Sequence, residues 1–242
     1  MKKTLSLLML LYVGGITAQT QPRVENYPLK AMDLVLYCFG MENPVPVGTI
    51  AASGELDFKF PNDLNFITDE VKANFMSDAA FTFFPKCANS YDILTESENI
   101  KAINAGYISL STKDNPYSGL LFMVTDENIV PWIESYGDID AVLGSYFELV
   151  YVASDFNYQG DCTAAITYIE NDPIETSYIY NLQLKAGFNF IEYKIESAAA
   201  HKIPSAYEEG VFNTIEKPTR ITVTSTQSTP PITQWIGKYF YY

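Results

Sequence analysis

The feature that most constrains the fold is a strict alternation of apolar and polar residues along several short segments. Residues 55–60 (ELDFKF) alternate without a fault, and residues 191–196 (IEYKIE) alternate equally clearly. A period of two places successive side chains on opposite faces of a β-strand. Residues 145–152 (SYFELVYV) are rich in aromatic and β-branched residues instead, which is typical of an interior strand. The chain is therefore expected to be mainly β.

Further segments with strand character lie along the chain at 33–40, 105–112, 119–125, 163–169 and 220–225. The clearest hairpin is predicted at 177–196, where Gly187 can adopt the positive φ of a turn between two alternating runs. The clearest helical spacing lies at 63–76, with Asp63 as its N-cap. We therefore expect a mainly β fold, built as an antiparallel β-sandwich with one or two short helices.

The C-terminal residues suggest an alternative fold. The chain ends in an aromatic residue, with Phe240 two positions and Gly237 five positions before the end. This spacing is similar to the terminal strand signal of bacterial outer-membrane β-barrels, although Trp235 stands where a polar residue is expected. Such barrels contain repeated alternating strands of about ten residues, and most runs here are shorter. A small outer-membrane β-barrel is thus the alternative to a sandwich.

The N-terminal residues indicate export. Residues 1–18 (MKKTLSLLMLLYVGGITA) combine a basic start, a short apolar core and small residues before Ala18. This order is typical of a secretory signal peptide. We expect cleavage after Ala18 and a single β-rich domain over residues 19–242. The expected location is extracytoplasmic, in the periplasm, at the cell surface or outside the cell.

Three cysteines, Cys38, Cys87 and Cys162, remain after residue 18. An exported protein meets an oxidising environment, so one disulfide and one free thiol are expected. Cys38 lies in the apolar segment LVLYCFG, whereas Cys87 and Cys162 lie in polar segments. We therefore predict a disulfide between Cys87 and Cys162, with three unpaired thiols as the alternative. The spacings do not match a zinc or iron–sulfur motif.

Charge and histidine content exclude several classes of function. Asp and Glu outnumber Lys and Arg by 29 to 15, so the formal net charge is −14. Because nucleic-acid binding requires a basic face, we expect no nucleic-acid partner. His201 is the single histidine, which excludes sites that need two imidazoles, and no G-x-S-x-G motif accompanies it. We assign no catalytic or cofactor-binding residue from the sequence.

Aromatic residues and one acid are the candidate ligand contacts. Glu148 interrupts an apolar strand and lies on the same side of it as Tyr146. Exposed rings can stack on sugar faces, although tyrosine also fills β-sheets well. Glycoside hydrolysis needs a second carboxylate, which the sequence does not locate. The possible contacts are Tyr117, Trp132, Tyr136, Glu148 and Tyr158.

Calcium is the one cofactor for which the sequence offers candidate loops. Residues 126–128 (DEN) and 137–140 (GDID) cluster hard oxygen atoms of the kind that calcium prefers. Neither segment matches the twelve-residue calcium loop of helix–loop–helix proteins. Ordinary acidic loops are the alternative, and we assign no metal ligand.

Three segments, together with the signal peptide, carry a resemblance to known proteins. The segments GELDFKFP at 54–61, SYFELVYVASD at 145–155 and LQLKAGFNFIEYKIES at 182–197 resemble uncharacterised secreted proteins of the Bacteroidetes type. The resemblance carries no catalytic motif, and it implies a β-rich, exported, sandwich-like envelope protein. We therefore expect a non-enzymatic binding or structural role in the cell envelope, with a glycan or an envelope protein as partner. A carbohydrate-binding module or a carboxylate-dependent glycan-active protein is the alternative function.

Overall fold

The fold is taken from a computed structural model of the chain. It describes residues 22–27, 29–37, 44–65, 67–84, 86–87, 100–169, 172–205, 208–228 and 232–240. The expected signal peptide at 1–18 and Cys38 lie outside these residues. The described part is mainly β, as the alternating segments predict.

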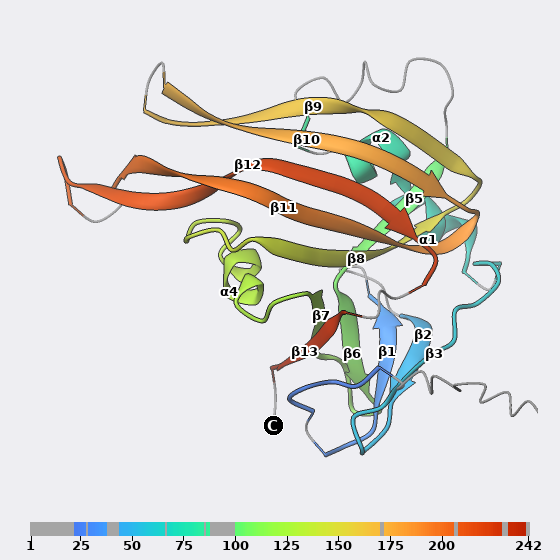
Figure 1. The fold of residues 1–242 in the computed structure, drawn as a ribbon. Helices are drawn as coiled ribbons and strands as arrows, with labels where there is room; N and C mark the ends of the chain where they lie inside the picture. The colour runs from blue at the N-terminus through green and yellow to red at the C-terminus, as the bar shows by residue number, and fades with distance from the viewer. Residues whose placement is uncertain are drawn as a thin grey trace, which may run out of the picture.

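The described strands form one sheet (Figure 1). They are β1 (Met32–Leu36), β2 (Val45–Ile50), β3 (Leu56–Phe58), β4 (Ser77–Asp78), β5 (Lys101–Gly106), β6 (Ile108–Thr112), β7 (Asn115–Val124), β8 (Gly144–Val152), β9 (Phe156–Ile169), β10 (Asp172–Leu184), β11 (Gly187–Pro204), β12 (Phe212–Thr226) and β13 (Gln234–Tyr239). The main order is β3-β2-β1-β6-β7-β8-β11-β12-β10-β9, with β13 paired to β7 and β5 paired to β8. Over the described residues this sheet does not close into a barrel, so the β-barrel alternative is wrong.

The sheet has two halves that run in different directions. Figure 1 shows the long strands β9 to β12 lying across the direction of β1, β2 and β6. The halves meet where β7 pairs with β8, at Met123 opposite Phe147 and Val124 opposite Tyr146. Because β7 and β8 pair over only these two positions, the sheet can bend sharply between them, so that one half lies against the other.

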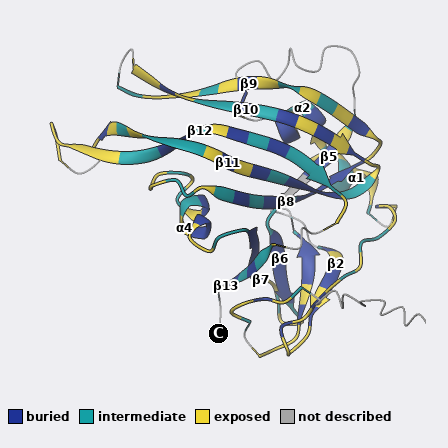
Figure 2. Cartoon of the chain, viewed as in Figure 1, coloured by how far each residue is buried: buried dark blue, intermediate teal, exposed yellow. Residues whose placement is uncertain are grey.

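Strand β8 is buried on both faces, as its apolar sequence predicts. Phe147, Leu149 and Tyr151 belong to a core shared with β1, β2, β6 and β7. Val150 and Val152 point the other way, into a core formed with β9 to β12, and Tyr146 packs against that core. Figure 2 shows the contrast between buried β8 and the exposed far end of the β11–β12 hairpin. The two faces of β8 therefore serve two different cores.

The hairpin expected at 177–196 is the main topological error of the sequence prediction. Strand β10 does not pair with β11, because β12 lies between them. β12 is antiparallel to β11, and it is parallel to β10 from Ser177 opposite Arg220 to Asn181 opposite Thr224. All other pairs of strands described are antiparallel, so the sheet is mixed rather than purely antiparallel.

The turn between β10 and β11 is nevertheless tight and well bonded. Gly187 has a φ of 103°, in the region that favours glycine. The Asn189 side chain accepts a hydrogen bond from the Lys185 N–H at 3.0 Å and donates one to the Lys185 carbonyl at 2.7 Å. Asp155 accepts hydrogen bonds from Lys185 Nζ at 2.7 Å and from the Ala186 N–H at 2.9 Å, and these lower the Asp155 pKa. The turn is thus tied to the loop that precedes β9.

Short helices lie at α1 (Asp69–Phe75), α2 (Ala79–Phe83) and α4 (Ile129–Glu134). The first begins later than predicted, because Thr68 rather than Asp63 is its N-cap and accepts a hydrogen bond from the Val71 N–H. Asp63 accepts a hydrogen bond from the N–H of Asn65 and so forms a local turn. No helix among the described residues has the length and apolar character needed to cross a bilayer.

The structure contains the disulfide that the sequence predicts. Cys87 and Cys162 are bonded, with their Cα atoms 5.7 Å apart and a sequence separation of 75. Cys162 lies on β9, and Cys87 follows α2, so the bond fastens this helical segment over the β9–β12 core. Residue Lys86 is thereby held beside the same sheet face.

Candidate functional site

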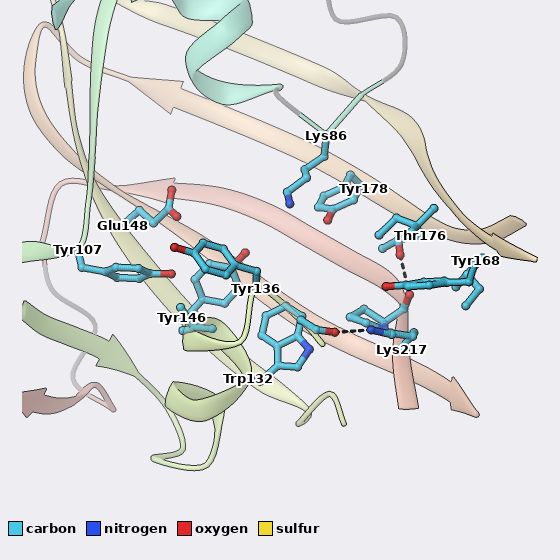
Figure 3. A pocket seen from close by; sticks show the side chains of 15 residues that line it. Lys86, Tyr107, Trp132, Tyr136, Tyr146, Glu148, Tyr168, Thr176, Tyr178 and Lys217 are labelled. Carbon is cyan, nitrogen blue, oxygen red and sulfur yellow. Dashed lines mark hydrogen bonds between the residues drawn. The ribbon is translucent and has the colours of Figure 1, made fainter. Parts of the chain in front are cut away.

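The candidate site is a cavity of about 220 Å³ on the sheet face that carries Tyr146 and Glu148. It lies between β8, β9, β10 and β12, and α4 with its following turn forms the opposite wall. Figure 3 shows the labelled side chains converging from these elements. The lining residues are Lys86, Tyr107, Trp132, Ile133, Tyr136, Gly137, Tyr146, Glu148, Ile166, Tyr168, Ile174, Thr176, Tyr178, Lys217 and Pro218. Aromatic rings therefore dominate the wall.

Helix α4 and the turn after it present two of these rings, Trp132 and Tyr136. The Gly137 N–H donates to the Trp132 carbonyl at 2.9 Å, and the Tyr136 N–H donates to the Ile133 carbonyl at 3.0 Å. This pattern closes the end of the helix and requires a left-handed residue, a position that usually holds glycine. Tyr136 occupies it with a φ of 55°, and its side chain is 95% exposed. The fold thus holds a tyrosine ring at the mouth of the cavity at a cost in backbone strain.

A buried lysine lies on the opposite wall. Lys217 on β12 is only 5% exposed, and its Nζ donates a hydrogen bond to the Gly137 carbonyl. The same ammonium lies 5.4 Å from the centre of the Tyr168 ring. Next to it, Thr176 Oγ1 donates to the Pro218 carbonyl at 2.7 Å, just before the parallel pairing of β10 and β12 begins. The hydrogen bond to Gly137 and the contact with the Tyr168 ring hold the Lys217 ammonium in the wall.

Glu148 lies at the other end of the cavity, among tyrosines. Figure 3 shows Glu148 and Tyr107 on one side and Tyr168 and Lys217 on the other, with Tyr136 between them. Burial raises the pKa of Tyr107 and of Tyr146, and the charge of Glu148 raises both further. Burial also raises the pKa of Tyr178 to about 12. At neutral pH these phenols are therefore hydrogen-bond donors rather than anions.

Three of the five ligand contacts proposed from the sequence meet in this cavity: Trp132, Tyr136 and Glu148. Tyr117 lies on β7 in the other half of the sheet, where its ring packs between Tyr37 and Phe240. Tyr158 lies on β9 against Phe84, with ring centres 4.6 Å apart, and does not line the cavity. These two residues are therefore separate from the candidate site.

Sequence reasoning missed most of the remaining wall. Tyr146 and Tyr178 could be placed on the correct face from strand alternation, but nothing in the sequence brings the two strands together. Lys86 stands next to Cys87, so the predicted disulfide could have pointed to it. Lys217 lies in a part of β12 that precedes the predicted strand at 220–225, and no sequence signal marks it.

The candidate calcium loops do not form a cluster of ligands in the described residues. Asp126 Oδ1 accepts hydrogen bonds from the backbone N–H and the side-chain amide of Asn128, both at 2.8 Å. Asp140 Oδ1 accepts one from the Glu216 N–H at 2.8 Å. Across the described part of the chain, no group of three or more His, Cys, Asp or Glu side chains could hold a metal ion. His201 lies on β11, opposite Ile215 of β12.

The chemistry available in the cavity is that of binding a polar ring-shaped ligand. Flat rings offer apolar contact, the phenols donate hydrogen bonds, Glu148 accepts them, and Lys217 supplies a positive charge. Glu148 is the one acid among the described residues that line the cavity. In comparisons with protein families, with curated proteins and with solved structures, no match to this chain is found.

Proposed function

We propose that this protein is an exported, non-enzymatic β-rich protein of the cell envelope that binds glycans. The observation that carries the proposal is the cavity lined by Trp132, Tyr136, Tyr146 and Tyr178, with Glu148 at one end. Aromatic faces with a few convergent polar groups are the usual composition of a small-molecule site. Sugars suit such a wall because their rings have apolar faces and hydroxyl edges.

Binding rather than hydrolysis is favoured by the carboxylate content of the wall. Glycoside hydrolysis by paired carboxylates requires two acids about 5–10 Å apart across the scissile bond. Among the described residues that line the cavity, Glu148 has no acidic counterpart. Glu148 is therefore assigned to accepting hydrogen bonds from sugar hydroxyls.

Two observations support export. Residues 1–18 have the order of a secretory signal peptide. The bond between Cys87 and Cys162 is of a kind that forms and persists mainly in oxidising compartments. Expression with the N-terminal segment in a bacterial host should yield an exported protein that begins at residue 19. A cytosolic protein that retains residues 1–18 would contradict this part of the proposal.

The binding proposal is tested by calorimetry with purified protein and a panel of oligosaccharides. At least one glycan should bind, and Tyr136→Ala should weaken its binding about tenfold, because the substitution removes a ring from the cavity mouth. Tyr117→Ala gives the comparison, since Tyr117 is also an exposed tyrosine, at 37%, but lies in the other half of the sheet. Binding to no glycan, or a loss confined to Tyr117→Ala, overturns the proposal.

A further inference from the structure

The buried ammonium of Lys217 lacks a negative partner within the described structure. The ion pairs formed by described residues do not include Lys217. Its Nζ has three N–H donors, and the contacts described use one of them, on the Gly137 carbonyl. A buried charge is costly unless a counter-charge or several hydrogen bonds compensate it. An anionic group of a bound ligand can therefore supply the counter-charge that Lys217 lacks.

Lys217 lines the cavity, so a ligand bound there can reach its ammonium. Lys217 lines the cavity together with Tyr168 and Thr176, and Figure 3 shows its amino group at the end opposite Glu148. The Thr176 hydroxyl donates to the Pro218 carbonyl and carries no formal charge, so it does not neutralise the ammonium. The Tyr168 ring contributes a cation–π contact, which carries no formal negative charge.

A second lysine approaches the same cavity. Lys86 is exposed, and Figure 3 shows its side chain extending from the segment after α2 towards the space beside Tyr178. The adjacent Cys87 is bonded to Cys162, which anchors the main chain at this point. Two lysines thus converge on one cavity in a chain whose acidic residues outnumber its basic ones by 29 to 15.

We propose that the cavity selects anionic sugars, with the carboxylate or sulfate group on Lys217 and the ring between Trp132 and Tyr136. This inference rests on the proposed glycan binding and adds the class of sugar. Glu148, at the far end, accepts hydrogen bonds from hydroxyl groups of the same ligand. The volume of about 220 Å³ is below the roughly 300–1,000 Å³ of sites for drug-sized molecules, so the cavity takes one charged ring of a longer glycan.

The net charge of the chain does not prevent this recognition. The formal charge of −14 repels an acidic glycan at long range, but screening limits the repulsion to about 8 Å at physiological ionic strength. Contacts within the cavity are screened much less, because the lysine is buried. The local positive charge at Lys217 therefore decides which sugars bind at contact.

The test is calorimetric titration with three sets of oligosaccharides of equal length: galacturonate oligomers, sulfated galactose oligomers and neutral galactose oligomers. The wild-type protein should bind at least one of the two acidic sets about tenfold more tightly than the neutral set. Lys217→Met should abolish this preference, whereas Lys217→Arg should retain it. Lys113→Met, in the exposed turn between β6 and β7, is the control for the same loss of charge.

If Lys217→Met does not fold, Lys86→Met tests the same inference. This substitution removes an exposed charge and should weaken acidic binding about two- to fivefold without changing neutral binding. Binding of neutral sugars with equal or greater affinity would overturn the inference and leave glycan binding in place. Retention of the acidic preference in a folded Lys217→Met variant would also overturn it. Binding to none of the three sets, when other glycans bind, likewise rejects the anionic sugar, and binding to no glycan at all rejects both proposals.

Discussion

The Gly137 N–H donates a hydrogen bond to the Trp132 carbonyl at 2.9 Å, and this contact forces Tyr136, between them, into a left-handed conformation. The left-handed region costs an L-residue roughly 1–2 kcal/mol, and glycine avoids the cost. The ring of Tyr136 makes almost no use of burial, since it is 95% exposed. The strain is therefore linked to the exposed position of this ring rather than to packing in the core.

Tyr136→Gly should stabilise the protein while weakening glycan binding. Relief of the left-handed strain should raise the free energy of unfolding by about 0.5–1 kcal/mol, after the greater chain entropy of glycine is taken into account. Denaturant unfolding measures the stability, and calorimetry measures the affinity. Tyr136→Ala is the matched variant, because it removes the ring but keeps the strained Cβ. A Gly variant that is no more stable than the Ala variant would contradict the prediction.

Removal of the disulfide should affect both stability and the cavity. The double variant Cys87→Ser, Cys162→Ser should lose about 2–4 kcal/mol of unfolding free energy, because the bond constrains a separation of 75 residues in the unfolded chain. It should also bind acidic oligosaccharides as weakly as Lys86→Met, since Lys86 loses its anchored neighbour. In the unreduced wild-type protein, thiol titration should detect one of the three cysteines. Detection of three would contradict the disulfide.

Asn189 should be the most sensitive polar residue of the β10–β11 turn. It is 1% exposed and bonds to both the N–H and the carbonyl of Lys185. Asn189→Ala leaves these backbone groups without partners and should cost about 1–3 kcal/mol in unfolding free energy. Asn181→Ala, at an exposed position on β10, should change stability by less than about 0.5 kcal/mol. Equal effects of the two substitutions would show that the turn does not depend on Asn189.

Buried tyrosines should make the fold sensitive to alkali. Burial raises the Tyr178 pKa to about 12, whereas an unfolded tyrosine ionises near pH 10. Between these values the unfolded chain releases protons that the folded protein keeps, so stability is full below pH 10 and falls as pH rises. Tyr178→Phe should reduce this dependence, as measured by denaturant unfolding at pH 9, 10 and 11. An unchanged slope in the variant would assign the effect to other tyrosines.

Strand positions and faces could be predicted because alternation reports local burial. Tyr178, Tyr180, Leu182 and Leu184 share one face in the sequence pattern, and all four are buried in one core. Alternation does not predict which strands pair with one another. Residues 177–196 have the local pattern of a hairpin. In the structure, however, β12 lies between β10 and β11 and forms hydrogen bonds with both strands. Nothing within a twenty-residue segment can report that a third strand enters from elsewhere in the chain.

The candidate site was predictable to the extent that its residues are unusual for their position. Glu148 interrupts an apolar strand, and Trp132 and Tyr136 lie between predicted strands. The same criterion selected Tyr117 and Tyr158, which serve packing elsewhere. Lys217 could not be singled out, because lysines usually lie on protein surfaces. Its burial depends on contacts with Gly137 and Tyr168 that are distant in sequence.

The position of β12 has a consequence for biosynthesis. Until residues 212–226 have been synthesised, β10 and β11 each have an unpaired edge of backbone N–H and carbonyl groups. Such edges readily pair with other chains, so a nascent or truncated chain that ends before β12 is prone to aggregate. The pairing of β10 and β11 into one sheet is therefore completed only by a segment that follows both strands in sequence.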